Sequence, residues 1–583
     1  MSPETRNLIA AMSLSLAILI GWQLYFVEPE LEAQRAAYNE QAAQQSELPQ
    51  PSGQQTGPLS GQSSGQLADQ TATAALTDEG RRITISTATV SGSLSTMGAR
   101  IDDILLTSYA ETQDEGADNI HLMLPFTSPE PYIAEFGWVG APSQQLYLPD
   151  ANTVWQANSD ILSPDSPLIL RWDNGQGLAF TRAISINDDY LITVKDSVAS
   201  TTDNAVQLSP YGLLRRTGTP QTDGLYILHE GPLGVFDETL SEQDYDDLVD
   251  AGNRGLSFDT ETAGGWIGIT DKYWLAALMP EQNQKVSFAM RALQGSPQRY
   301  QTDFLGQQQT LQPGAEISWT TYLFAGAKRV ALLDRYSEEL NIPNFDLAID
   351  FGWFYFLTKP FFYGLSKLYD MLGNFGMAII VFTIFVRLAL FPLANKSYKS
   401  MGKMRELAPR IQKMREDFGD DKPRLQREMM ALYKSENVNP AAGCLPIILQ
   451  IPVFFALYKV LYVSIEMRHA PFYGWISDLS AVDPTSIFNL FGLLPYSVDF
   501  IPQFLSIGIW PILMGISMAV QMRLNPPPPD PVQAKIFQWM PVFFTFLLAG
   551  FPAGLVIYWT WNNTLSILQQ WWITRNIKKT MGS

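Results

Sequence analysis

Cysteine and histidine are nearly absent from this chain of 583 residues. The single cysteine, Cys444, excludes an intramolecular disulfide framework, and it stands at the start of an apolar run, where we expect a buried thiol rather than a nucleophile. The three histidines, His121, His229 and His469, are too few and too scattered for a metal site. We therefore expect neither a metal nor a cofactor.

Catalytic motifs are lacking as well. Residues 80–325 contain no phosphate-binding loop, no nucleophile elbow and no spacing of metal ligands. We therefore expect a protein that is not an enzyme. An acidic β-sandwich can nevertheless carry a sugar-processing site, so a membrane-anchored periplasmic sugar enzyme stays open as an alternative.

Basic residues are scarce in the first part of the chain. Residues 28–345 hold 17 Lys and Arg against 42 Asp and Glu, whereas residues 394–440 hold 11 against 7. This asymmetry indicates that the two segments lie on opposite sides of a membrane, with the basic segment 394–440 in the cytoplasm, because Lys and Arg collect in cytoplasmic loops. It does not indicate specific binding of nucleic acid.

Long apolar runs are abundant, and most lie after residue 350. The run at 8–27 ends in bulky residues where a signal peptidase needs small ones, so we interpret it as an uncleaved anchor. Lys and Arg recur at every second connection, which predicts six spans with both termini in the cytoplasm. The predicted order is a cytoplasmic lead 1–7, an anchor 8–27, a flexible linker 28–79, a periplasmic domain 80–340, an interfacial helix region 341–373, five core spans at 374–395, 443–463, 504–522, 536–551 and 554–573, a cytoplasmic segment 396–439, a periplasmic loop 464–503, a cytoplasmic loop 523–535 and a cytoplasmic tail 574–583.

The periplasmic domain has the sequence pattern of an all-β fold. Short runs at 82–90, 178–186, 190–198 and 317–324 are rich in β-branched and aromatic residues, with Gly, Asp, Asn and Pro between them. Many short strands at this spacing predict a large antiparallel β-sandwich. The following stretch 354–372 is aromatic on one side, which is typical of a helix in the membrane interface.

Arg387 lies inside the apolar run 374–395, NFGMAIIVFTIFVRLALFPLAN. An arginine at the centre of a membrane helix costs roughly 2.5–3.5 kcal/mol on insertion scales, and it keeps its charge. None of the other core spans contains Asp or Glu. The charge therefore faces water or a transient guest, unless the side chain reaches to the inner interface instead.

Other polar residues cluster toward the cytoplasmic side of the predicted spans. A pore would be polar along its whole length, so this distribution favours a blind, hydrated groove over a channel or transporter. Some of these residues can instead link helices by hydrogen bonds. The predicted groove residues are Arg387, Thr383, Gln450, Ser517, Tyr558, Trp559, Asn562 and Asn563.

The cytoplasmic segment 396–439 repeats apolar residues at alternating steps of three and four, which predicts two helices in a hairpin. The hairpin is all-helical, basic and rich in methionine, an adaptable side chain for contacts with many partners. The alternative is a plain connection between two spans. The residues predicted to contact substrate or partners are Met404, Arg405, Lys413, Met414, Met429 and Met430.

Several long motifs resemble one family. They are TIFVRLALFPL, MREDFGDDKPRLQREMMALYK, VNPAAGCLPIILQIPVFFALYKVL, APFYGWISDLSAVDP, PILMGISM and FPAGLVIYW. Over about 345–575 the chain closely resembles the YidC/Oxa/Alb family of membrane protein insertases, of the Gram-negative type. The resemblance implies an α-helical bundle of five core transmembrane helices plus an anchor helix, with a periplasmic β-supersandwich, in the inner membrane.

The resemblance also implies a working site and partners. In the family an arginine at the position of Arg387 lies in a hydrophilic groove open to cytoplasm and lipid, and Thr383 and Gln450 match groove residues. The family often has two tyrosines where this chain has Tyr558 and Trp559. Implied partners are nascent hydrophobic membrane-protein segments, lipids, the Sec translocon, and ribosome or targeting factors at the cytoplasmic loops, whereas the short tail argues against a strong ribosome-binding tail.

Overall fold

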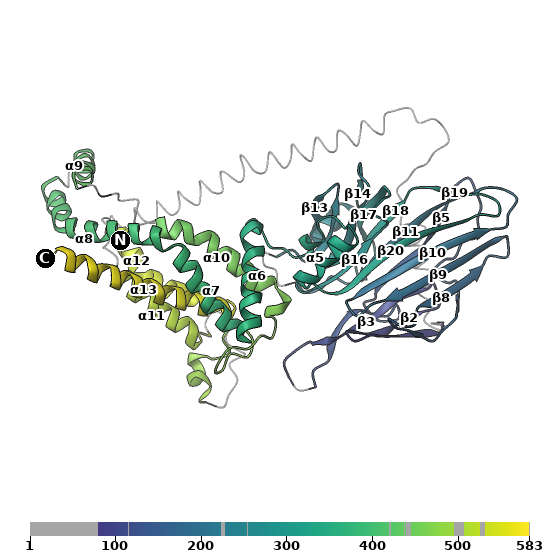
Figure 1. Ribbon diagram of the computed structural model, residues 1–583, viewed down its shortest axis with the longest axis horizontal. Coiled ribbons are helices and arrows are strands. Elements are labelled where there is room, and N and C mark those ends of the chain that lie inside the picture. The colour runs from purple at the N-terminus through teal and green to yellow at the C-terminus, as the bar shows by residue number, and fades with distance from the viewer. Residues whose placement is uncertain are drawn as a thin grey trace. The chain divides into compact units, whose positions relative to one another are not determined.

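The computed structural model describes residues 80–581, except for 115, 223–227, 253–254, 419–420, 437, 439–444, 495–505 and 525–530. The predicted lead 1–7, anchor 8–27 and linker 28–79 lie outside the described residues, as does Cys444. Strands occupy the described chain up to residue 327, and helices dominate the part that follows (Figure 1).

Two large sheets form the first part. One has eleven strands, in the order β14-β17-β18-β11-β5-β3-β2-β1-β7 with β19 on β11 and β4 on β3, and the other has nine, in the order β13-β12-β15-β16-β20-β10-β9-β8-β6. Neighbours pair antiparallel except β1 and β7. The strands are β1 Arg82–Ser86, β2 Val90–Ser95, β3 Arg100–Ala110, β4 Asn119–Met123, β5 Tyr132–Gly140, β6 Gln156–Ala157, β7 Ile161–Leu162, β8 Leu168–Asp173, β9 Leu178–Ile186, β10 Leu191–Ser200, β11 Val206–Thr217, β12 Gly231–Phe236, β13 Thr239–Glu242, β14 Leu256–Asp259, β15 Trp266–Thr270, β16 Trp274–Met279, β17 Val286–Leu293, β18 Arg299–Gly306, β19 Gln309–Leu311 and β20 Glu316–Ala327.

Strand β9 shows how the sequence sets this architecture. Its residues LAFTRAISI alternate, so Leu178, Phe180, Ile184 and Ile186 are buried on one face. Alternation with a period of two is what a strand with one face on a core requires. The predicted β-sandwich is confirmed.

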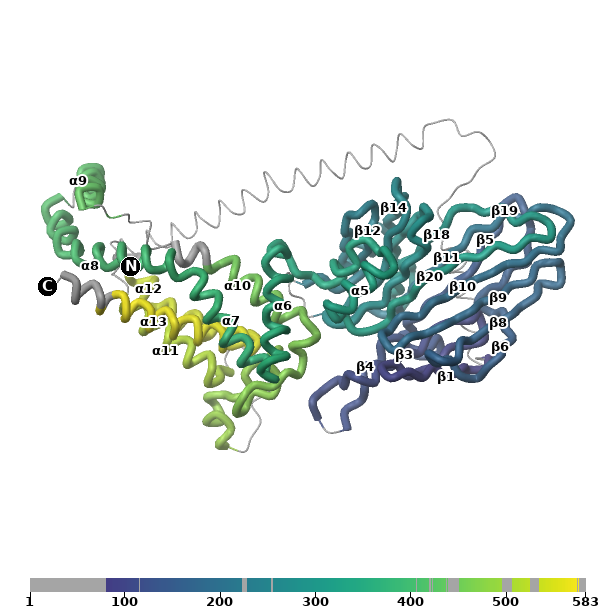
Figure 2. Tube along the Cα trace, in the orientation of Figure 1, coloured from purple at the N-terminus to yellow at the C-terminus, as the bar shows by residue number. Residues whose placement is uncertain are grey.

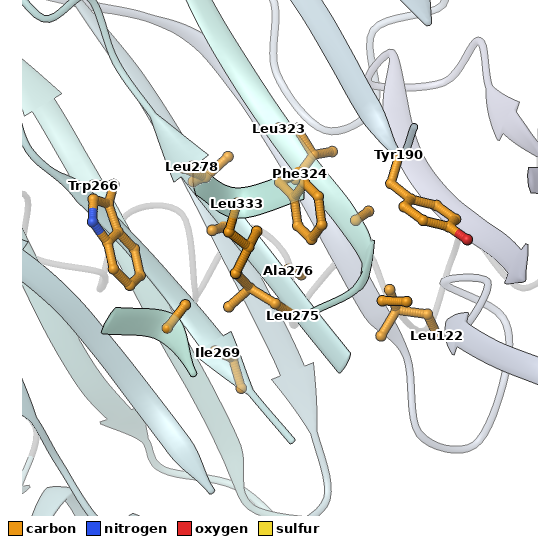
Figure 3. Packing of buried hydrophobic residues seen from close by; sticks show 14 of the residues in the cluster. Leu122, Tyr190, Trp266, Ile269, Leu275, Ala276, Leu278, Leu323, Phe324 and Leu333 are labelled. Carbon is orange, nitrogen blue, oxygen red and sulfur yellow. The ribbon is translucent and has the colours of Figure 1, made fainter. Parts of the chain in front are cut away.

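Large apolar side chains fill the space around the second sheet (Figure 3). Trp266 on β15 and Phe324 on β20 are fully buried, and the ring of Phe345 lies 5.3 Å from that of Trp266 and 5.8 Å from that of Phe324, edge-on to both. Each buried aromatic side chain contributes about 1.5–3 kcal/mol by leaving water. Phe345 thereby packs the segment that follows the last strand against the second sheet.

The helices and 3₁₀ turns come after the strands, apart from α4 (Figure 2). Their bounds are α4 Tyr245–Asp250, α5 Val330–Glu339, η3 Phe345–Ala348, α6 Tyr355–Leu372, α7 Phe375–Ala389, α8 Phe391–Phe418, α9 Lys422–Ser435, α10 Leu445–Val463, η5 Ile465–Met467, η6 Ile487–Gly492, α11 Ile509–Leu524, α12 Pro531–Leu548 and α13 Ala553–Met581. The aromatic stretch 354–372 forms α6, and the segment 396–439 forms two helices as predicted.

The span predicted at 374–395 is not one straight helix. α7 ends at Ala389 and α8 begins at Phe391, with a bend of 68° between them. Pro392 supplies the reason, because it has no N–H to donate and its ring crowds the preceding turn. The prediction of a continuous helix was wrong at this point, since it weighed apolar length and gave no weight to the proline.

The helices in the described part of the chain differ in length and apolar composition. None of those helices is by itself long and apolar enough to cross, whereas the bent pair Phe375–Ala389 and Phe391–Met404 passes when taken together. Shorter apolar helices run over Gln450–Val463, Ile509–Leu524 and Ala534–Leu548.

Candidate functional site: a pocket around Arg387

Helix α7 places Arg387 in its last turn. The side chain of Asn374 begins the helix by accepting a hydrogen bond from the backbone N–H of Met377. A cation in the last turn is favoured by the partial negative charge at a helix C-terminus. Arg387 therefore lies at the end of an apolar helix, where the chain bends, and not at the middle of a continuous span.

The guanidinium of Arg387 donates hydrogen bonds to α13. Its Nε lies 2.8 Å from Oδ1 of Asn562, and its Nη2 lies 3.2 Å from the backbone carbonyl of the same residue. Nη2 also donates to Oγ of Ser566 and lies 3.5 Å from Oε1 of Gln450 on α10. These partners are neutral amide, carbonyl and hydroxyl oxygens, so they hold the guanidinium and leave its charge uncompensated.

No carboxylate compensates this charge within the part of the chain that the structure describes. The helices α7, α10, α11, α12 and α13 contain no Asp or Glu. The recorded bonds of Arg387 all end on neutral oxygens. A guanidinium has five N–H donors, so it can take an additional acceptor from a guest.

A small pocket that is partly open to solvent lies beside Arg387. It is formed where α7, the start of α8, α10 and α13 meet. Its lining residues are Thr383, Val386, Arg387, Leu390, Leu393, Ala394, Gln450, Val453, Tyr558 and Asn562. Its lining therefore combines polar and aliphatic side chains, which suits a guest that carries both kinds of surface.

Five of the eight predicted groove residues line this pocket: Arg387, Thr383, Gln450, Tyr558 and Asn562. They come from three helices, and Tyr558, Asn562 and Ser566 follow one another at steps of four along α13. The hydroxyl of Thr383 donates to the carbonyl of Ile379 at 2.6 Å, so its polar atom is already satisfied by its own helix.

The other three predicted residues lie elsewhere. Nδ2 of Asn563 donates to Oγ of Ser517 at 3.1 Å, which links α13 to α11. The ring of Trp559 lies 4.9 Å from Phe454 and 5.8 Å from Phe544. None of the three is among the residues that line this pocket: Asn563 is bonded to Ser517 on α11, and Trp559 packs among aromatic rings. Their place in the groove stays a prediction.

Sequence reasoning missed part of the site. Ser566 is not among the predicted groove residues, although its position four residues after Asn562 puts both on one face of α13. The aliphatic lining at Val386, Leu393 and Val453 carries no distinguishing signal in the sequence.

The helical hairpin of α8 and α9 buries part of its predicted contact surface. Met404 and Met429 pack against a small core of Leu407, Tyr433 and Val438. By contrast, Met430 is 58% exposed. Lys413 is also exposed, Met414 is half-buried, and the side chain of Arg405 is outside the described part.

Known families match nearly the whole described chain. Residues 82–364 match the family described as YidC periplasmic domain, and residues 367–580 match the family described as 60Kd inner membrane protein. A solved structure described as an active YidC insertase with its first transmembrane domain resolved is similar at TM-score 0.34 and 15% identity, covering 88% of this chain and 98% of that one.

Curated relatives match over the full length. A membrane protein insertase YidC from Granulibacter bethesdensis is 48% identical over 99% of this chain and 98% of its own length. The relative of the same name from Bradyrhizobium diazoefficiens is also 48% identical, over 99% of this chain and 97% of its own length. The chain belongs to the YidC family of membrane protein insertases, with a periplasmic β-sandwich domain followed by the helical inner-membrane region.

Proposed function

We propose that this insertase works through the pocket around Arg387, which receives the hydrophilic flank of an incoming membrane segment from the cytoplasm. The supporting observation is a permanent cation held by neutral partners beside an open pocket. A carboxylate or a carbonyl of the guest supplies the missing acceptor. A hydrogen bond to a charged group contributes about 1.5–3 kcal/mol, which offsets part of the guest's lost hydration.

The aliphatic side chains of the pocket take the hydrophobic part of the same guest. Val386, Leu390 and Val453 present methyl groups next to the guanidinium. The segment then leaves for the lipid, driven by burial of its own apolar surface at about 25 cal/mol per Å². This path needs neither a sealed channel nor a covalent step, so the protein acts without enzymatic chemistry.

The topology proposed for this mechanism has both termini in the cytoplasm and the β-sandwich in the periplasm. Lys and Arg at 396–434, at 523 and 535 and at 575–579 mark the cytoplasmic side. A membrane potential negative inside then favours outward movement of an acidic flank by about 2.3 kcal/mol per charge per 100 mV. Energy for insertion therefore comes from partition and from the potential.

The hairpin of α8 and α9 is the proposed first contact for arriving segments or for ribosome and targeting factors. Met430 and Lys413 supply an exposed thioether and an exposed charge on its surface. The insertase acts alone or beside the Sec translocon. Crosslinking of nascent chains to a probe at Met430 tests the hairpin contact.

The decisive experiment replaces Arg387 and scores insertion of a small single-span substrate with an acidic flank in cells depleted of the native insertase. We expect Arg387→Ala to lower insertion at least tenfold and Arg387→Lys to retain more, because the lysine keeps the charge. The matched control is Arg523→Ala, which removes an exposed arginine at the end of α11. Unchanged insertion by Arg387→Ala would refute the proposed role of the pocket.

A further inference from the structure

The connection between α10 and α11 presents large apolar side chains at the surface. Residues 487–494, here called the apolar tip, contain six side chains that are 37–82% exposed: Ile487, Phe488, Leu490, Phe491, Leu493 and Leu494. The wider stretch 484–497 contains no charged residue. A partner that covers the tip is therefore not recognised through charged side chains of the tip.

The apolar tip stands on a base that is fixed to α11. The buried carboxylate of Asp483 accepts hydrogen bonds from Nε1 of Trp475 at 3.1 Å and from the backbone N–H of Trp510 at 2.9 Å. Trp510 lies in the first turn of α11. The backbone N–H of Ile487 also donates to the carbonyl of Ile507 at 3.0 Å. These bonds fix the position of the tip relative to the start of α11, a membrane helix.

The backbone of the tip forms its own hydrogen bonds. The N–H of Phe491 donates to the carbonyl of Ser486 at 2.7 Å, and the N–H of Leu494 donates to the carbonyl of Asn489 at 3.0 Å. Leu490 and Phe491 adopt left-handed backbone angles, with φ of 50° and 61°, and this turns the chain back on itself. These bonds satisfy part of the backbone of the tip, which lowers the cost of placing the segment in an apolar medium.

The helix α11, to whose first turn the tip is fixed, has an exposed apolar face of its own. Leu513, Ile516 and Val520 are 40–55% exposed and lie three and four residues apart along that helix. Tyr473 and Trp475, which are exposed on the same loop, are side chains that prefer the membrane interface. In Figures 1 and 2 the tip is part of the yellow-green chain at the end of the helical region away from α9.

We propose that the apolar tip is inserted into the periplasmic leaflet, with its side chains among the acyl chains just beneath the headgroups. Lipid is the occupant that fits, because the tip is uncharged, forms some of its backbone hydrogen bonds internally, and is fixed to the start of a helix whose own apolar face is exposed. The tip then anchors the periplasmic end of α11. The choice of leaflet rests on the proposed topology, whereas insertion itself does not depend on the role of Arg387.

Fluorescence quenching in liposomes tests this inference with the full chain. In a Cys444→Ala background, Leu493→Cys carries an environment-sensitive NBD label on the tip, Ile516→Cys carries it on the lipid-facing side of α11, and Asp165→Cys carries it on the exposed surface of the β-sandwich. The vesicles contain phosphatidylcholine and phosphatidylglycerol with nitroxide groups near the headgroup or near the middle of the acyl chain.

We expect the label at 493 to emit further to the blue than the label at 165 and to be quenched several-fold more by the shallow nitroxide. The label at 516 should respond more to the deep nitroxide. Emission and quenching at 493 equal to those at 165 would overturn the proposal, and would indicate that a protein partner covers the tip instead.

A second measurement guards against misfolding of one variant. Before labelling, the thiol at 493 should react several-fold more slowly with a membrane-impermeant maleimide than the thiol at 165. Equal rates in liposomes would also overturn the proposal, while slow reaction that becomes fast in detergent would support it.

Discussion

Nε of Arg387 donates to Oδ1 of Asn562 across 2.8 Å, although 175 residues separate the two along the chain. The amide orients the guanidinium without neutralising it, and the carbonyl of Asn562 adds a second acceptor at 3.2 Å. An aspartate in the same place would have nearly the same shape but would compensate the charge. The neutrality of Asn562 is therefore a testable part of the site.

Replacing Asn562 with aspartate should block insertion while preserving the fold. The new carboxylate would form an ion pair with Arg387 and compensate its charge, which the neutral amide does not. The guest's acidic flank would then meet a compensated site, and we expect insertion to fall about as far as in Arg387→Ala. The measurement is insertion of an acidic-flank substrate, with thermal unfolding to confirm the fold.

Asn562→Ser provides the comparison for that substitution. Serine shortens the side chain but adds no charge, so the variant should insert better than Asn562→Asp. Equal loss in both variants would show that the length of the amide side chain matters and that its neutrality does not.

A buried arginine joins the two sheets of the β-sandwich. Arg182 on β9 pairs with Asp196 at 2.7 Å and donates to the carbonyls of Ala99 and Phe136, at 3.1 and 2.6 Å, beside the other sheet. We expect Arg182→Met to lower the free energy of unfolding by about 3–5 kcal/mol, because it leaves a buried carboxylate unpaired. Denaturant titration of the full chain, followed by tryptophan fluorescence, measures this.

The control for Arg182 is Arg171→Met on β8, an exposed position. It should change the unfolding free energy by no more than about 0.5 kcal/mol. The double variant Arg182→Met/Asp196→Leu should recover much of the lost stability, since it removes both buried charges together. A double variant as unstable as the single one would contradict this account.

The sequence predicts a strand or helix correctly where the pattern of apolar and polar residues within one segment is enough to specify it. The alternation in β9 specifies a strand whatever its neighbours are, and the predicted 178–186 equals the observed Leu178–Ile186. The pairing of β11 with β5, or of β10 with β20, depends on contacts that are distant along the chain and leave no local signal. The sequence could have predicted the bend before Pro392, because a proline has no N–H to donate and its ring crowds the preceding turn of a helix.

The site could be predicted by residue type but not by geometry. Arg387, Gln450 and Asn562 stand out because polar residues in apolar helices are costly. Nothing in the sequence tells which face of α13 meets α7 and which meets α11, and so Asn562 could not be told from Asn563. That choice follows from helix packing, which places Asn562 on Arg387 and Asn563 on Ser517.

A buried amine makes the β-sandwich sensitive to pH. Lys328 is 2% exposed, and its Nζ donates to the hydroxyl of Thr270 at 2.8 Å. Burial lowers the pKa of Lys328 from 10.5 to about 8, although nearby carboxylates such as Asp271 oppose the shift. Between these two values the unfolded chain binds the proton that the folded chain has lost, so the stability contributed by this group rises with pH.

Lys328→Met should therefore stabilise the protein at pH 7 by roughly 3 kcal/mol, because it removes a charge that is costly to bury. Above pH 8 this advantage should shrink by about 1.4 kcal/mol per pH unit, as the native lysine becomes neutral. Unfolding free energies of both proteins between pH 7 and 10 give the difference. Lys285→Met, at an exposed lysine, should show no such trend.

Helices α11 and α12 approach closely at Gly515. A Cβ atom there would overlap Oγ1 of Thr545, which donates to the carbonyl of Pro541 at 2.8 Å. We expect Gly515→Ala to destabilise the helical region by about 1–3 kcal/mol through overpacking. Unfolding in sodium dodecyl sulfate, followed by circular dichroism, measures the loss.

A double-mutant cycle separates this overlap from the intrinsic effect of alanine in a helix. Thr545→Ala removes the overlapping oxygen, so Gly515→Ala should cost less in that background than in the native protein, by about 1 kcal/mol or more. Gly550→Ala is the control, because no atom lies within 4 Å of a Cβ built there. If Gly515→Ala costs the same with and without the threonine hydroxyl, the two helices are free to move apart at this point, and the close approach does not limit their packing.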